Sequence, residues 1–345
     1  MRAAVYRGID DVRLEDVPVP EIGPGELLLR VHACGVCGTD LKKIRHGLQP
    51  PPRVFGHEIA GTVAAVSAGD SEWRVGDRLV AHHHVPCGAC FYCERRLYSC
   101  CEGYRRTGTT AGFEPAGGGF AEFIRVMPFV RRGLVRIPEG VPFEQATLLE
   151  PLNTVLKGIA GLKPQAGEHA LVVGEGPIGL LFTRVLADRG LTVIGSDPLP
   201  YRRQAAGRMG ALAIDPGAVD VAGVCRDATG GRGADLAVVT AAGPTAIPAA
   251  VAAVRPGGRV LLFGQTRRGE LAEVDVGELC VQEKALLGSY SADIDLQPLA
   301  AELLFGGRIP AERLITHRFP LEEIGAALAA ASEPRPGALK VVVTP

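Results

Sequence analysis

The chain has 345 residues, of which 47% are hydrophobic and 22% are charged, a balance typical of globular proteins and not of disordered ones. This length exceeds one ordinary hydrophobic core and predicts two domains. The 37 basic and 38 acidic side chains give a formal net charge of −1, so no overall positive field favours nucleic acid or an anionic membrane. We expect neither as a partner.

The N-terminus and the cysteines indicate the compartment. No apolar run is long enough to span a bilayer, and the charges of Arg2 and Arg7 leave no room for a signal-peptide core. Nine cysteines are too few for a disulfide scaffold in a chain of this length, whereas clustered cysteines indicate metal binding or catalysis. The sequence therefore predicts a cytoplasmic protein.

The first 150 residues or so contain short strand-like segments that glycine and proline interrupt. Strands are expected at 26–31, 59–66 and 78–81, with turns between them. Because helical periodicity does not alternate with these strands, the segment predicts a β-barrel-like domain.

After Pro151 the pattern changes to alternating strands and helices. This alternation indicates a doubly wound parallel sheet, so the fold class is α/β with a separate β domain. We expect domains at 1–152 and 153–290, with 291–345 packing back on the first. Strands are predicted at 169–173, 191–195, 211–214, 235–240, 259–263 and 339–343, and helices at 201–209, 245–254, 296–304, 321–330 and in a stretch that ends near 190.

A glycine-rich segment lies between the first predicted strand and helix of the second domain. Its sequence has the pattern GxGxxG and comprises Gly174, Glu175, Gly176, Pro177, Ile178 and Gly179. The glycines permit a tight turn, approach of backbone to a pyrophosphate, and close packing of helix on strand, while the helix N-terminus offers free N–H groups. The context predicts a dinucleotide site and not an ordinary turn.

Asp197 follows the second predicted strand, at the spacing expected for a ribose-binding carboxylate. A carboxylate there repels a 2′-phosphate, which favours NAD over NADP, although Arg202 nearby would soften the preference. The alternative is that Asp197 only caps the helix that follows Pro198.

A cluster of cysteines in the first domain has the spacing C-x2-C-x2-C-x7-C. Four thiolates at this pitch can surround one Zn²⁺ tetrahedrally and leave no open position, so the site predicted is structural. Cys100 is an alternative to the last member, and a redox pair or an iron–sulfur cluster is an alternative to zinc. The predicted ligands are Cys87, Cys90, Cys93 and Cys101.

Three histidines, His82, His83 and His84, precede this cluster. Neighbouring residues of a strand point to opposite sides, so all three cannot face one ion. We interpret them as a strand end that leads into the cysteine loop, with room for one of them to line an active-site cleft.

A second metal site is predicted from separate pieces of the chain. A zinc ion that assists hydride transfer needs three protein ligands and one exchangeable position. Cys37, His57 and Glu150 can supply the three, and Glu58 can replace one of them. Each of these candidate ligands, taken alone, is more often a structural residue. Together they indicate a catalytic zinc site only because the same chain also contains a predicted dinucleotide domain and a four-cysteine loop.

The order of these motifs resembles the zinc-dependent medium-chain alcohol dehydrogenase superfamily, particularly its sorbitol, threonine and secondary-alcohol dehydrogenase branch. The resemblance spans the whole chain and is most specific at 37–40, 56–58, 87–101 and 174–179. It implies a GroES-like β-barrel catalytic domain and a Rossmann domain, with Cys37, His57 and Glu150 matching zinc ligands and Glu58 matching a glutamate that binds in their place.

The resemblance also implies a proton path and a cofactor set. Thr39 matches a hydroxyl that passes on the substrate proton, whereas the histidine that many relatives carry five residues after the catalytic cysteine is Lys42 here. His46 is not an obvious replacement, and Glu58 or a water is the alternative. The implied cofactors are NAD and two zinc ions per subunit, one catalytic and one structural.

The predicted function is reversible hydride transfer between NAD and a small alcohol. A polyol or secondary alcohol ranks first as substrate, and a threonine-like 3-hydroxy amino acid or a sugar is the alternative. A zinc-independent reductase of the superfamily would lack both zinc-ligand sets, and a non-catalytic NAD- and zinc-binding sensor is the rival from another class. By analogy with relatives we expect a homodimer or homotetramer.

Overall fold

The computed structural model describes residues 1–345 except 71, 83, 105–107, 242, 244, 265–268 and 333–336. The chain forms two compact units, one of Met1–Asn153 with Ala292–Pro345 and one of Thr154–Ser291. The boundary falls within helix α4 (Leu149–Leu162). Among the described residues no helix is long and apolar enough to cross a membrane.

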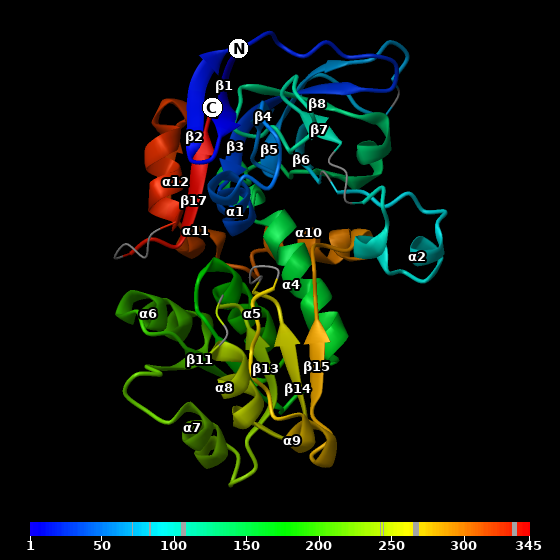
Figure 1. Ribbon diagram of the computed structural model, residues 1–345. Helices are drawn as coiled ribbons and strands as arrows, with labels where there is room; N and C mark the ends of the chain where they lie inside the picture. Colours follow the sequence, from blue (N-terminus) through cyan, green and yellow to red (C-terminus); the bar gives the residue numbers. More distant parts are fainter. Residues whose placement is uncertain are drawn as a thin grey trace. The chain divides into compact units, whose positions relative to one another are not determined.

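The first unit is built on antiparallel strands (Figure 1). One sheet has the order β16-β17-β3-β5-β6-β9, with β8 paired to both β3 and β7, and a smaller sheet has the order β2-β1-β4. Among the strands that the structure describes in this unit, only the β16–β17 pair is parallel. The strands are β1 Arg2–Gly8, β2 Asp11–Asp16, β3 Leu27–Gly35, β4 Arg53–Val54, β5 Glu58–Val66, β6 Arg78–Ala81, β7 Thr109–Thr110, β8 Phe123–Val126, β9 Leu134–Arg136, β16 Ile315–Pro320 and β17 Lys340–Thr344.

Helix α12 packs on strands β16 and β17 of this unit. Apolar strand residues such as Leu29 and Ile59 are fully buried in one core, to which the C-terminal segment contributes Ile324 and Val341. The return of the C-terminal segment to the first unit therefore has a physical cause, the burial of its apolar face. The helices are α1 Gly38–His46, α2 Phe91–Glu94, α3 Phe143–Ala146, α10 Gln297–Phe305, α11 Ala311–Leu314 and α12 Ile324–Ser332, with 3-10 turns at Tyr98–Cys100, Pro128–Gly133, Ile294–Leu296 and Leu321–Glu323.

The second unit is a six-stranded parallel sheet with the order β12-β11-β10-β13-β14-β15. Counted from β10, this is the 3-2-1-4-5-6 order of dinucleotide-binding folds. Parallel neighbours need crossover connections, which explains the helices between the strands. The elements are β10 His169–Val173, α5 Pro177–Asp188, β11 Thr192–Ser196, α6 Pro200–Met209, β12 Ala211–Ile214, α7 Val221–Ala228, β13 Ala234–Val239, α8 Ala246–Ala253, β14 Val254–Leu262, α9 Val276–Val281 and β15 Ala285–Gly288.

The predicted fold class, a β-rich first domain and a doubly wound parallel second domain, is confirmed. The strands at 169–173 and 211–214 have the predicted bounds. The sequence pattern did not predict α1, α7 or β15, and the helix expected at 321–330 is a 3-10 turn followed by α12.

Candidate active site and metal centres

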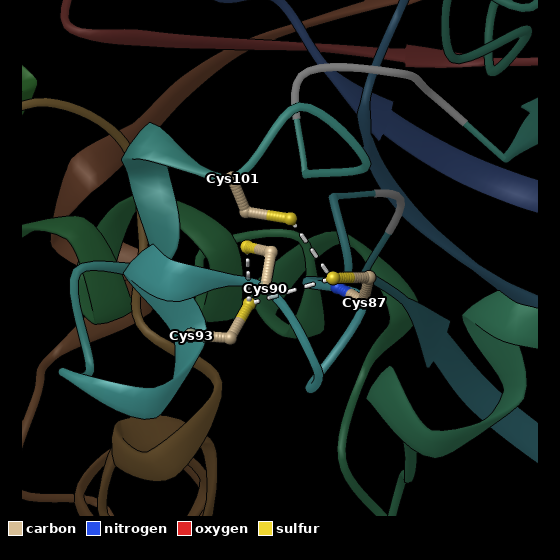
Figure 2. A group of neighbouring side chains, drawn as sticks. All are labelled: Cys87, Cys90, Cys93 and Cys101. Carbon is tan, nitrogen blue, oxygen red and sulfur yellow. Dashed lines mark hydrogen bonds between the residues drawn. The ribbon is translucent and has the colours of Figure 1, made fainter.

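The four predicted cysteines lie together in one lobe of the first unit, and their side chains point toward one another (Figure 2). All four Sγ atoms lie within 4.8 Å of one another. The Cys87–Cys93 and Cys90–Cys93 sulfur pairs are 3.8 and 3.6 Å apart. A tetrahedron with Zn–S bonds of about 2.3 Å has edges of about 3.8 Å, whereas a disulfide is only about 2.05 Å long. The spacing therefore fits a zinc ion and no disulfide.

Local backbone structure gathers the four sulfurs. Cys90 is the N-cap of α2 and Cys93 lies within that helix, so one turn brings the two together. Cys101 is buried and accepts a hydrogen bond from the Cys87 N–H at 3.4 Å, whereas its neighbour Cys100 is exposed and outside the group. Burial opposes ionisation of Cys101, but N–H donors from Cys87 and Tyr104 lower the pKa of its thiol to about 6. This donor set favours thiolate, the form that binds metal.

A second group consists of Cys37, His57 and Glu58, whose candidate ligand atoms also lie within 4.8 Å of one another. Strand pairing explains how distant parts of the chain meet there. Antiparallel β3 and β5 place Gly35 opposite Glu58, and Cys37 follows Gly35 by two residues. A Cβ atom on Gly35 would collide with the Glu58 carboxylate, so only glycine leaves room for it. Thiolate, imidazole and carboxylate are ligands that suit Zn²⁺.

Asp40 holds the imidazole of this group. It lies in the first turn of α1 and is fully buried, and its Oδ1 lies 3.0 Å from Nδ1 of His57. The other carboxylate oxygen accepts the Cys37 N–H at 3.4 Å. With Nδ1 directed to Asp40, Nε2 is the nitrogen left for a metal, the arrangement in which a carboxylate orients a ligating histidine. Burial would lower the pKa of His57, but the charges of Asp40 and Cys37 raise it well above its ordinary value.

Lys340, from the C-terminal strand β17, forms a buried ion pair with Glu58. Its Nζ also donates to the carbonyl of Val36 at 3.1 Å. Burial opposes the charge of Lys340, but the carboxylate of Glu58 raises its pKa, so the ammonium stays charged. The sequence pattern alone predicted no role for Asp40 or Lys340. The signs that could have indicated a role are the position of Asp40 as the third residue of a helix and the position of Lys340 as the single charged residue of an apolar strand.

Glu150 lies in the first turn of α4 and is only 8% exposed. It is outside the group of three, but its carboxyl is close enough for the charges of His57 and Glu58 to act on it. Burial raises its pKa to about 7, with His57 opposing and Glu58 adding to the rise. Among the described residues no hydrogen bond or ion pair satisfies this carboxyl, whereas the carboxylate of Glu58 pairs with Lys340.

The remaining predicted residues of the first unit lie on α1 or at the end of β6. Thr39 is half-buried, and its N–H lies 3.5 Å from Cys37 Sγ. Lys42 is half-buried and His46 is exposed. Of the three adjacent histidines, His83 lies outside the described residues. Burial, aided by the charge of His57, lowers the pKa of His82 to about 4 and that of His84 well below its ordinary value.

The predicted dinucleotide turn connects β10 to α5 in the second unit. Gly174 has φ 94°, a conformation that side chains disfavour, and a Cβ on Gly179 would collide with the Gly174 carbonyl. Gly176 is the N-cap of α5, with Pro177 and Ile178 in the first turn. A Cβ on Gly176 would meet only the Arg202 guanidinium, at 4.0 Å. The turn thus leaves open backbone at a helix N-terminus, which fits a pyrophosphate.

Asp197 follows β11 at the edge of this turn and is 1% exposed. Its carboxylate accepts the N–H of Glu175 at 2.8 Å and that of Leu199 at 2.9 Å. Arg202 Nη1 lies 3.6 Å from it. Asp197 therefore both fixes the start of the α6 segment and stands beside the glycine turn.

Comparisons with known proteins agree with this arrangement. Residues 23–139 match the alcohol dehydrogenase GroES-like domain, and residues 177–305 match the zinc-binding dehydrogenase domain. The sorbitol dehydrogenase of Bacillus subtilis is 31% identical over 100% of this chain and 97% of its own. The L-threonine 3-dehydrogenase of Pyrococcus horikoshii is 33% identical over 89% of this chain and 87% of its own.

A solved structure extends the likeness to three dimensions. An alcohol dehydrogenase of Escherichia coli CFT073, complexed with NADH, has a TM-score of 0.87 and 28% identity and covers 100% of this chain and 99% of its own. The chain belongs to the zinc-type medium-chain alcohol dehydrogenase family. It is an oxidoreductase of the NAD(P)-linked alcohol and polyol dehydrogenase class, with one four-cysteine site and one Cys/His/Glu site.

Proposed function

We propose that this enzyme transfers a hydride between NAD and a polyol or secondary alcohol, in either direction. The observation that carries the proposal is the convergence of Cys37, His57 and Glu58 within 4.8 Å in a chain that also has a dinucleotide turn. The sorbitol dehydrogenase likeness supports a polyol. A 3-hydroxy amino acid is the second candidate, which the threonine dehydrogenase likeness favours, and a sugar is a third.

Cys37, His57 and Glu150 would hold the catalytic zinc. The carboxylate of Glu58 is already balanced by Lys340. Glu150 is buried and has no hydrogen-bond or ion-pair partner among the described residues, so a dication would offset the cost of its desolvation. Glu58 is then the ligand that exchanges with it. Zinc held there supplies the Lewis acidity that makes a hydroxyl more acidic, and NAD supplies the hydride acceptor.

The residues of the chain then have separate tasks. Asp40 keeps His57 in the tautomer and orientation that a metal ligand needs. Thr39, beside Cys37, accepts the proton of the substrate hydroxyl and passes it outward. Lys340 pairs with the carboxylate of Glu58 while Glu58 is not a ligand.

The second zinc would be structural, because four thiolates close its coordination shell. For the cofactor, we propose NAD in preference to NADP because the Asp197 carboxylate lies beside the glycine turn and would repel a 2′-phosphate. Gly174, Gly176 and Gly179, with Pro177, Ile178 and Arg202, would form the rest of this site. The predicted cytoplasmic location stays a prediction.

A homodimer or homotetramer is proposed through strand β15, which is the last strand of its sheet. The side chain of Tyr290, just beyond the strand, is 47% exposed. An uncovered strand edge can pair with a second copy. Light scattering that shows a monomer at micromolar concentration would contradict this.

The decisive experiment is NADH formation with a panel of polyols, secondary alcohols, 3-hydroxy amino acids and sugars, with and without a chelator. Cys37→Ser should abolish turnover and still bind NADH, whereas Cys280→Ser, at an exposed cysteine of the second unit, should be as active as the wild type. NADH binding without turnover on any substrate would support the non-catalytic sensor instead.

A further inference from the structure

The residue between the first two glycines of the dinucleotide turn, Glu175, is fully buried. Its Oε1 accepts a hydrogen bond at 2.7 Å from the hydroxyl of Thr183, a residue of helix α5. Its Oε2 has no hydrogen-bond partner among the described residues. A carboxyl in this position is unusual because burial of an unpaired charge is costly.

The surroundings of Glu175 are shaped to hold the side chain. On β11, a Cβ atom at Gly195 would collide with Oε1 of Glu175, so this strand position leaves space only as glycine. The backbone N–H of Glu175 donates to Asp197 at 2.8 Å. One residue therefore connects the glycine turn to α5 through its side chain and to the candidate ribose carboxylate through its main chain.

The charged groups around Glu175 do not neutralise it. Asp197, which follows β11, carries a like charge that raises the pKa of Glu175. Among the described residues the cation paired with the Asp197 carboxylate is Arg202 of α6, at 3.6 Å, while Arg203 of the same helix donates to the Asp197 carbonyl at 2.9 Å. Burial, the largest cause, raises the pKa of Glu175 to about 8, against the lowering effect of the Thr183 hydrogen bond.

We propose that Glu175 is a positioning residue that supports the dinucleotide turn in its neutral, protonated form, so that loss of its proton weakens binding of the dinucleotide. An ionised Glu175 would add a buried negative charge beneath a helix N-terminus, where the pyrophosphate brings its own negative charge. Binding of the dinucleotide and of this proton then favour each other, as linked equilibria require. The inference rests on the proposed NAD site and adds a proton that the family chemistry does not require.

The test is the dissociation constant of NADH, measured by fluorescence titration of the zinc-loaded enzyme from pH 6.5 to 9.5. If the complex keeps the proton, wild-type affinity falls about tenfold between pH 7 and pH 9, since only the free enzyme titrates near pH 8. Glu175→Gln, which is neutral at every pH, should change less than twofold over the same range. Asp227→Asn, an exposed carboxylate of α7, is the matched control and should follow the wild type.

Two outcomes would overturn the inference: a wild-type affinity that is flat with pH, or a Glu175→Gln curve that falls like the wild type. The first outcome is measured on the wild type, so the inference can be tested even if Glu175→Gln does not fold. Glu175→Ala, which also carries no charge at this position, is the second variant. A wild type that fails to bind NADH even at pH 7 would instead refute the proposed NAD site, and this inference with it. An infrared carboxylic-acid band that disappears above about pH 8 and is missing in Glu175→Gln would be direct support.

Discussion

The buried pair of Lys340 and Glu58 connects the C-terminal strand to the candidate catalytic group, and its removal has a calculable effect. Both side chains are almost inaccessible, with exposed fractions of 5% and 2%. Lys340→Met keeps most of the apolar stem but leaves the Glu58 carboxylate without its cation and the Val36 carbonyl without its donor. Breaking a buried pair from one side costs about 3–5 kcal/mol in free energy of unfolding.

The double variant Lys340→Met/Glu58→Gln separates this cost from simple loss of packing. With neither charge present, most of the lost stability should return, because the penalty belongs to the uncompensated carboxylate. Urea unfolding followed by circular dichroism gives the three free energies, measured once with saturating zinc and once with a chelator. If the double variant is no more stable than Lys340→Met in either condition, the pair does not act as argued.

Three shorter predictions concern the other groups. Asp40→Asn should weaken zinc binding by about 10–100-fold, because the partner that orients His57 loses its charge, and competition with a chelator measures this. Cys101→Ser should remove one zinc per chain by elemental analysis while Cys100→Ser keeps it, and equal zinc contents would contradict the assignment. Asp197→Ala should weaken NAD binding and reduce the preference over NADP; an unchanged ratio of the two dissociation constants would refute its role.

The sequence was most informative where the pattern is local. The four cysteines lie within 15 residues, and the glycine turn directly follows a strand, so spacing alone defines both. The strands of the second unit were also predictable, since parallel strands are buried on both faces and consist of continuous apolar residues. Segment β15 escaped prediction because its four residues, Ala285–Gly288, are short and alternate in exposure.

The candidate active site was less predictable because its partners meet only through the tertiary fold. Lys340 lies at the far end of the chain from Glu58, and the pairing of β17 with β3 is what brings it there. Likewise, the near contact of Cys37 with Glu58 depends on the register of β3 with β5. No spacing rule along the chain encodes such pairings, so only the resemblance to a family indicated the set, and even that did not reveal Lys340.

Glu175 provides a last test, because its ionisation affects folding as well as binding. Its pKa is about 8 in the folded chain against an ordinary value of 4.5, so the folded state holds the proton more tightly. The stabilising effect of the neutral carboxyl is complete below about pH 4.5 and is lost as pH rises through about 8, at about 1.4 kcal/mol per pH unit in that interval. Glu175→Gln has no such loss. In urea unfolding, its free energy of unfolding should therefore rise relative to that of the wild type from pH 5 to pH 8, and the difference should be constant above pH 9. If the free energies of unfolding of the two proteins run parallel across the whole pH range, Glu175 is ionised in the folded protein. Its surroundings must then hold a compensating charge, which the contacts with Thr183, Gly195 and Asp197 do not provide.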